Sequence, residues 1–490
     1  MWGGDPTGRT RIFAIVAGLG GVCLFLSAPL TITFDSAHYL GYLTILRGEV
    51  PLDQWDVVRG PVFPIWLWCM RAVFGTSPTA ALVVSGLCLG VTVVAIDSAW
   101  SRCLPQRLRQ RATLCAALVV AFDPTSFGYF HTLLTEYLAA TLFSVGLAIA
   151  AARIHLWSKG KTFGIAAELG SAGLAAFAYH LKQPYLAAIV FPLVFASVWA
   201  FRHSRIWPRA LGSLALTLGV VSASIFVWGK MLPNTGPAAD GKRSAGTLAA
   251  NTLAATCLRA SIGLFRESDS NVDVCASPSW RDQPEISAFR LEAACEDNVL
   301  SNTEAAGLCL HSFGKKPLGP FVELVRGLGD LYSFGASHEH FAIAHRTFRA
   351  GPEQSPVFWL PDAMKPRVES YAQPAIENGG IVRLLGRLAP LSLLFHAALG
   401  VLAIALALAS LRWIWRLGDN DNLLTPMLFV ASSTAAAYSA TLVVFGLTID
   451  RYQYPIFPVA VVAVGLAFAR WLISRQATPA PKPDANAMPG

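Results

Sequence analysis

Long apolar runs alternate with short polar segments along most of this chain. A helix of about 20 apolar residues is needed to cross roughly 30 Å of hydrocarbon. Runs of suitable length occur at about 12–32, 79–100, 112–129, 134–152, 163–180, 184–201, 210–229, 388–411, 423–447 and 453–473. The pattern predicts an all-α polytopic membrane protein with about ten transmembrane helices. The count is open by one or two, because the runs within 112–152 and 163–201 are short and closely joined.

The first apolar run begins beside two basic residues, Arg9 and Arg11. A positively charged start followed by an apolar core is also a feature of signal peptides. The apolar part of this run is about 20 residues long, which suits a spanning helix better than the shorter core of a signal peptide. We therefore predict a first helix that stays in the membrane.

Two shorter segments lie between the first and second spans. Apolar residues recur at helical spacing in 39–46, so this segment can lie flat on a membrane. Residues 61–74 (PVFPIWLWCMRAVF) would form a helix of only about 21 Å, which is too short to span. Arg71 near its far end would also be unfavourable in lipid. The first outer loop, 33–78, is therefore predicted to hold two interfacial helices.

The apolar pattern divides the chain into four parts. The long polar stretch between the seventh and eighth spans has balanced charge and is long enough to be a small, mostly helical domain. The predicted parts are an N-terminal transmembrane module (1–229), an extracytoplasmic loop domain (230–387), the last three spans (388–475) and a disordered Pro- and Ala-rich tail (476–490).

Four of the nine cysteines lie in the predicted loop domain: Cys257, Cys275, Cys295 and Cys309. They allow two disulfides if that domain faces an oxidising compartment. Four free thiols are the alternative.

Composition and charge support a membrane protein and set its orientation. The chain is 54% hydrophobic and 14% charged, against roughly 25% charged residues in soluble domains. Its net charge of +8 is explained by basic clusters in the loops after alternate spans, and no nucleic-acid-binding motif accompanies them. Basic loops face the cytoplasm, so both termini are predicted to be cytoplasmic. The clusters are Arg102, Arg107, Arg109 and Arg111; Arg153, Lys159 and Lys161; Arg202, Arg205 and Arg209; Arg412 and Arg416; Arg470 and Arg475.

In this orientation, acids and bases collect at the outer membrane surface. Arg59, Lys182 and Arg451 have the chemistry to hold a phosphate by charge-assisted hydrogen bonds. Asp35, or alternatively Glu136, is a candidate base. The sequence has no Gly-rich phosphate loop, no H-E-x-x-H, no G-x-S-x-G and no Cys/His metal spacing. A phosphate at the lipid surface therefore points to a lipid phosphate and away from a nucleotide.

Four motifs at these residues resemble those of the C-fold membrane glycosyltransferases. They are D-S-x-x-Y-L from Asp35, R-G-P-V-F-P (59–64), L-L-T-E-Y-L (133–138) and R-Y-Q-Y-P-I-F-P (451–458). The branch most similar contains the protein O-mannosyltransferases and the aminoarabinose lipid A transferases. The resemblance covers about 12–230 and 388–473, and it does not cover 230–387.

The resemblance implies a reaction and a set of roles. A sugar passes from a polyprenyl-phosphate donor to an extracytoplasmic acceptor (a cell-envelope glycan, lipid or protein), with inversion at the anomeric carbon. Asp35 would be the base that deprotonates the acceptor. Arg59, Arg451 and Lys182 would bind the donor phosphate, although Q-P follows Lys182 where many relatives have an Arg-Pro pair. The residues implied in orienting the substrate are Glu136, His38 and Asp56.

The resemblance leaves the cofactor open. Some members carry paired acids in the first loop, whereas Ser36 follows Asp35 here. One carboxylate is a poor divalent site, so no metal ligand is assigned and a divalent cation remains only an alternative.

Each candidate residue also has a structural interpretation. Asp35 can cap a helix, Glu136 can pair with a basic neighbour, Lys182 can be an ordinary loop charge, and Arg59 and Arg451 can be interfacial anchors. Two further functions compete with transfer. One is a transporter that moves a lipid-linked sugar without chemistry, and the other is a binding protein that keeps the fold. Transporters usually show internal repeats and mid-membrane helix breaks, which this sequence lacks.

Overall fold

The structure of this protein is a computed structural model. The structure describes residues 34–52, 55, 60–74, 78–130, 134–203, 206–231, 314, 318–332, 380–416, 423–444 and 453–476. Predictions that fall elsewhere are the first span, the four cysteines between 257 and 309, most of the predicted loop domain, the residues after 476, and the side chains of Asp56, Arg59 and Arg451. They lie outside the described residues.

Every regular element within the described residues is helical, so the protein is an all-α polytopic membrane protein. The apolar runs account for this, since a helix satisfies all of its own backbone groups in lipid. The elements are α2 (Phe34–Leu46), α3 (Val62–Phe74), α4 (Pro78–Trp100), α5 (Gln106–Phe122), α6 (Pro124–Phe130), α7 (Glu136–Ser158), α8 (Ile165–Leu181), η2 (Gln183–Leu186), α9 (Ala187–His203), α10 (Trp207–Met231), α14 (Gly319–Leu331), α17 (Gly380–Arg416), α18 (Leu424–Val444), η6 (Tyr454–Ile456) and α19 (Phe457–Gln476).

Seven helical segments in the described part of the chain are long and apolar enough to cross a membrane. They lie in α4, α7, η2 with α9, α10, α17, α18 and η6 with α19. The helices α5 and α8 have 17 residues each, or about 26 Å, which is slightly less than the hydrocarbon thickness. The predicted count of about ten therefore stays a prediction.

Two predicted boundaries are wrong, and each has a local cause. The third span was expected at 112–129, but α5 ends at Phe122 and a separate helix, α6, begins at Pro124. A proline disfavours helical backbone in the residue before it, so the helix breaks at Asp123. The fourth span was expected to end at 152, but α7 continues to Ser158.

Arg153, predicted as a loop charge, lies inside α7 with a side chain only 1% exposed. Its Nη2 is 2.6 Å from Glu168 Oε2 on α8, and its guanidinium lies 5.3 Å from the centre of the Phe163 ring. A similar pair joins α4 to α5, where Asp97 accepts hydrogen bonds of 2.8 Å and 2.5 Å from Arg109. These basic residues are therefore structural partners in helix packing, because a buried charge requires a counterion.

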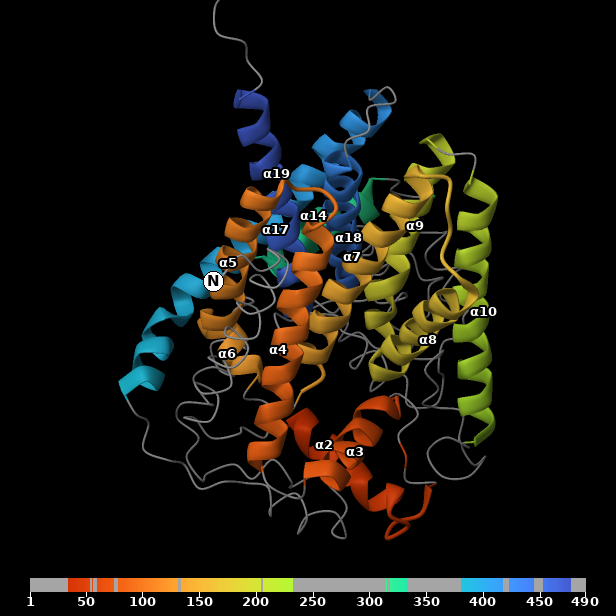
Figure 1. The fold of residues 1–490 in the computed structure, drawn as a ribbon. Helices are drawn as coiled ribbons and strands as arrows, with labels where there is room; N and C mark the ends of the chain where they lie inside the picture. The colour runs from red at the N-terminus through yellow and green to blue at the C-terminus, as the bar shows by residue number, and fades with distance from the viewer. Residues whose placement is uncertain are drawn as a thin grey trace, which may run out of the picture.

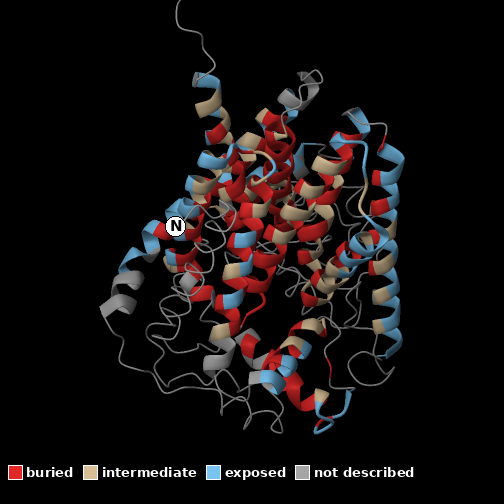
Figure 2. Ribbon diagram, viewed as in Figure 1, coloured by how far each residue is buried: buried red, intermediate tan, exposed pale blue. Residues whose placement is uncertain are grey.

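The centre of the bundle is built from α7 and α18, which Figure 2 shows as mostly buried. Gly146 permits the close approach of α7 to α9, because a Cβ at this position would lie 1.9 Å from the carbonyl oxygen of Ala188. Small residues at membrane helix contacts commonly allow such approach. By contrast, α10 has a largely exposed face that includes Leu211, Leu218 and Phe226, as expected for a helix facing lipid.

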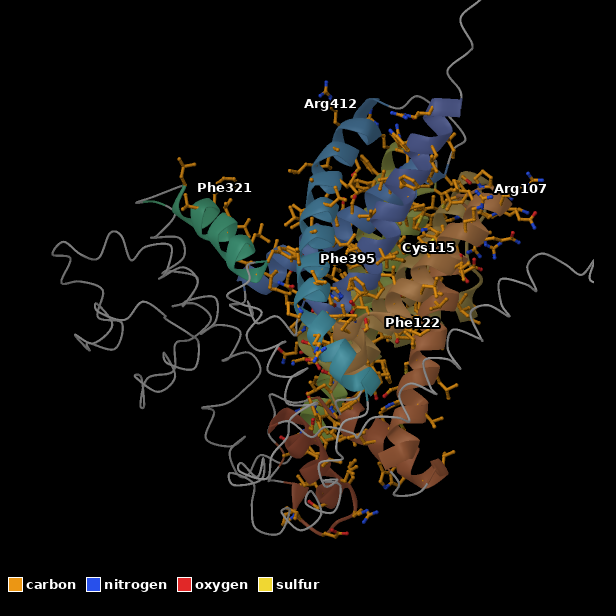
Figure 3. The ribbon with its side chains drawn as sticks, turned by 90° about the vertical axis from the view of Figure 1, so that its left-hand side faces the viewer. Arg107, Cys115, Phe122, Phe321, Phe395 and Arg412 are labelled. Atoms are coloured by element: carbon orange, nitrogen blue, oxygen red, sulfur yellow. The ribbon has the colours of Figure 1, made fainter. Side chains whose placement is uncertain are left out.

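The helices α2 and α3 pack together at one end of the bundle (Figure 1). Their presence confirms the two helices predicted in the first outer loop, while their position at the membrane surface stays a prediction. Arg107 and Arg412 lie toward the opposite end (Figure 3). The two ends of the bundle therefore differ, with α2 and α3 at one end and these basic residues toward the other.

Candidate functional site

The structure describes the predicted site residues to different extents. The structure describes the side chains of Glu136 and Lys182. Asp35 and His38 lie on α2, near its start, and nothing is described of their side chains. The structure therefore gives the side-chain separation of only two predicted site residues. The other predicted residues are located through their neighbours in the chain.

Glu136 and Lys182 meet where α7 begins and α8 ends. The distance between Lys182 Nζ and Glu136 Oε1 is 3.6 Å, and the Glu136 side chain is fully buried while that of Lys182 is 19% exposed. Thr135 Oγ1 donates to the other carboxylate oxygen at 3.3 Å. Glu136 is the first residue of α7, where the helix dipole favours a negative charge. Glu136 is therefore the buried member of this pair, and Lys182 lies on its more exposed side.

A sharp change of backbone direction positions Lys182. This residue ends α8 with φ −167 and ψ 130, which is extended backbone, and η2 follows at once. Pro184 lies in the first turn of η2, a position where its missing N–H is not needed. The Lys182 ammonium lies 6.0 Å from the centre of the buried Tyr185 ring, within the range of a cation–π contact. The K-Q-P-Y sequence thus directs the lysine toward Glu136.

Gly60 brings the R-G-P segment against the same end of α8. A Cβ on Gly60 would lie 1.8 Å from the carbonyl oxygen of His180. Only a residue without a side chain allows two backbones to approach this closely. Gly60 therefore fixes the segment that follows Arg59 beside the turn that carries Lys182.

Substituting Gly60 with alanine is expected to separate the first outer loop from the end of α8. The added methyl meets backbone, which cannot rotate away, so we expect a loss of about 1–3 kcal/mol in stability. Thermal unfolding in detergent measures this loss. Gly170→Ala in α8 is the matched control, because a Cβ there meets open space and alanine favours helix over glycine. Equal unfolding temperatures for the two variants would contradict the close contact.

An aromatic series connects α2, α3 and α7. The ring of Tyr39 meets that of Phe63 edge-on at 4.8 Å, and Phe63 meets Tyr137 at 6.4 Å. All three residues are buried. Such pairs are worth about 0.5–1.5 kcal/mol each beyond their buried area. Because Tyr137 directly follows Glu136, the series holds α2 and α3 against the first turn of α7.

A second aromatic series ties α2 to α10. Tyr42 stacks on Trp55 with 4.4 Å between ring centres, and Trp55 meets Trp228 edge-on at 5.5 Å. Trp55 is 1% exposed although it lies in the connection between α2 and α3. The two series together anchor the first outer loop at two points.

These contacts bring four segments to one place: α2, the R-G-P segment with α3, the start of α7, and the turn after α8. The lysine is partly exposed there and the acid behind it is fully buried, so the ammonium group is the more accessible member of this pair. Within the described residues, no group of three or more His, Cys, Asp or Glu side chains lies close enough to hold a metal ion.

Sequence reasoning identified Glu136 and Lys182 separately and missed the residues that support them. In the sequence, Gly60 and the aromatic residues Tyr39 and Phe63 stand out only as parts of motifs or apolar runs. Sequence reasoning also missed Ser392 and His396, which meet Asp123. A signal existed for these two, because polar residues four positions apart within an apolar span share one helix face.

Comparison with known proteins gives weak likenesses. No family model and no curated protein matches the chain. Among solved structures, the chain is similar to ArnT from Cupriavidus metallidurans bound to undecaprenyl phosphate, with 15% identity, a TM-score of 0.34, and coverage of 94% of this chain and 78% of that one. For the apo state of the same protein, the identity is 14% and the TM-score is 0.33, with coverage of 94% of this chain and 77% of that one. Likeness at this level supports no assignment of activity.

Proposed function

We propose that this protein is an integral membrane glycosyltransferase of the C-fold type. In the proposed reaction it moves a sugar from a polyprenyl-phosphate donor to an extracytoplasmic acceptor. The proposed location is the cytoplasmic membrane of a bacterium, with both termini in the cytoplasm and the active site on the outer face. Three kinds of evidence support the proposal: the polytopic helical bundle, four motifs in the expected order, and the contacts between the segments that carry them.

The observation that carries the proposal is the pairing of Glu136 with Lys182 beside Gly60. The acidic motif, the lysine turn and the R-G-P motif are far apart in sequence. The 3.6 Å ion pair and the Gly60–His180 contact bring them together. A lysine held by a buried carboxylate is restricted in position, and a restricted cation binds an anion with less loss of conformational freedom. This arrangement suits a phosphate that arrives from the lipid side.

The chemistry follows from the proposed roles. Asp35 accepts the proton of the acceptor hydroxyl as the acceptor oxygen attacks the anomeric carbon. The bond between that carbon and the phosphate oxygen breaks, and its electron pair leaves with polyprenyl phosphate. Attack opposite the leaving group inverts the anomeric centre. Arg59, Lys182 and Arg451 bind the phosphate and stabilise the charge that develops on it.

Glu136 has a supporting role in this proposal. Its carboxylate is fully buried behind Lys182, so it holds the lysine and thereby orients the donor. His38 and Asp56 are proposed to orient the substrate from the first outer loop. A divalent cation has no assigned ligand set here, and the proposed steps use side chains alone.

Release of free polyprenyl phosphate tests the proposal directly. Purified protein, reconstituted with a polyprenyl-phosphate sugar and an envelope extract as acceptor, is expected to generate polyprenyl phosphate with time. Mass spectrometry of the lipid fraction measures it. Transfer of the lipid between leaflets without release would instead indicate a transporter. Comparison of envelope glycans and lipids from cells with and without the protein would identify the sugar and its acceptor together.

A further inference from the structure

A second buried polar cluster lies at the junction of α5 and α6. Asp123 ends α5 and caps α6, because its Oδ2 accepts a hydrogen bond from the backbone N–H of Ser126 at 2.7 Å. The same oxygen lies 2.9 Å from His396 Nε2 on α17. The hydroxyl of Ser392, one turn earlier on α17, donates to the other carboxylate oxygen and lies 2.6 Å from the Thr125 hydroxyl. The cluster therefore joins two segments that are distant in sequence.

The environment of this cluster is apolar. The side chains of Asp123 and His396 are 5% and 7% exposed. Their chain neighbours Phe122 and Phe395 are 47% and 42% exposed, and both lie between the two ends of the bundle (Figure 3). Ionisable side chains that are almost fully buried are unfavourable unless they are paired, so this cluster requires an explanation. A purely structural contact is the alternative, and the Asp97–Arg109 ion pair between α4 and α5 is an example of such a contact.

The cluster is continuous with the segments beside the proposed site. The His396 ring stacks on Phe457 with 3.7 Å between centres, and it lies 6.3 Å from the buried ring of Tyr454. Tyr454 in turn stacks on Tyr129 of α6 at 4.5 Å. Both η6 and α6 pack against α7. The cluster thus clamps α6 and η6 together against the helix that begins at Glu136.

We infer that Asp123, Ser392 and His396 are positioning residues for the donor site. They act through α6 and η6, which they hold against α7, and so they set the position of Glu136 and its partner Lys182. This inference rests on the proposed function, because it assigns the cluster an effect on donor binding. The proposed role explains why Asp123, at the break between α5 and α6, contacts α17, which lies far along the chain.

The test compares donor KM with turnover in His396→Leu and Asp123→Asn. Asparagine caps a helix as well as aspartate does, so Asp123→Asn removes the charge and keeps the cap. A displaced Glu136–Lys182 pair is expected to raise donor KM by up to about 100-fold, the effect that a misplacement of about 1 Å can have. Acceptor KM is expected to stay unchanged. A loss of folded protein alone lowers the apparent turnover and leaves KM as it was.

Three further variants sharpen the test. His396→Gln keeps a neutral donor at the end of the side chain and is expected to restore most of the donor affinity. Ser392→Ala removes one hydrogen bond and keeps the contact between Asp123 and His396. It therefore gives a measurable protein if the stronger variants do not fold. Asp97→Asn breaks the pair between α4 and α5 and is expected to lower stability without raising donor KM.

Hydrogen exchange provides a readout that does not depend on activity. Peptides covering 124–130 and 453–457 are expected to exchange faster in His396→Leu, and at the wild-type rate in Asp97→Asn. Unchanged exchange in His396→Leu overturns the inference, as does an unchanged donor KM in an active protein. If the wild-type protein releases no polyprenyl phosphate, the proposed function fails, and the exchange rates alone then decide whether the clamp exists.

Discussion

Replacing Asp35 with asparagine is expected to lower kcat for sugar transfer by about 10²- to 10⁴-fold, the usual contribution of a general base. Asparagine has nearly the same shape and cannot accept the acceptor's proton. Donor KM is expected to stay close to the wild-type value, because the proposed role of Asp35 is exerted in the transition state and not in binding. Initial rates of polyprenyl phosphate release at saturating donor measure the effect.

The matched control for Asp35 is Glu49→Gln, which neutralises another acid of the first outer loop. Glu49 is 45% exposed and lies 3.5 Å from Arg47, and exposed ion pairs of this kind contribute little. Its turnover is expected to equal that of the wild type. A normal rate for Asp35→Asn, with folding confirmed by thermal unfolding, would remove Asp35 from the mechanism. Glu136 would then be the next candidate base.

The second large effect is expected from Lys182→Met. This substitution removes the cation that faces the proposed phosphate and leaves the carboxylate of Glu136 fully buried without that cation. Loss of one partner of a buried pair is strongly destabilising, and because Lys182 is partly exposed we expect about 3 kcal/mol, the lower end of the usual range. Donor KM is expected to rise as well. Unfolding in detergent and steady-state kinetics measure the two effects.

A double-mutant cycle separates the pair from its individual residues. Lys182→Met combined with Glu136→Gln is expected to be less destabilised than the sum of the two single variants, because the double variant leaves neither charge without the opposite charge of this pair. Strict additivity would indicate that the 3.6 Å contact carries no coupling. Glu168→Gln, which removes the partner of the buried Arg153, serves as a control that loses stability without a change in donor KM.

Much of the fold was predictable because hydrophobic length is a local property of the sequence. Apolar runs indicated the spans in α4, α9, α10 and α18 at nearly the observed positions. The helices α2 and α3 followed from runs too short to cross the membrane. Two predicted helix boundaries were wrong because of individual residues. Pro124 ended α5 early, and Arg153, which looked like a loop charge, was accommodated within α7 by Glu168.

The sequence indicates candidate site residues one by one, and it does not indicate which of them are in contact. The chemistry of Glu136 and Lys182 is visible in the sequence, but their 3.6 Å separation depends on how α7 packs beside α8. The importance of Gly60 likewise became clear only from the backbone of His180 lying against it. Ser392 and His396 belong to an apolar span in the sequence, and only the tertiary structure shows that both contact Asp123.

The sequence by itself therefore determined that the protein is a bundle of membrane helices, and it limited the candidate chemistry to a few acids and bases between them. These properties depend on residue type and on spacing within one helix, which neighbouring residues along the chain control. The tertiary structure alone decided which of these charges meet. The Glu136–Lys182 pair and the Asp123–His396 pair each join separate helices, and such contacts depend on the packing of side chains across the bundle.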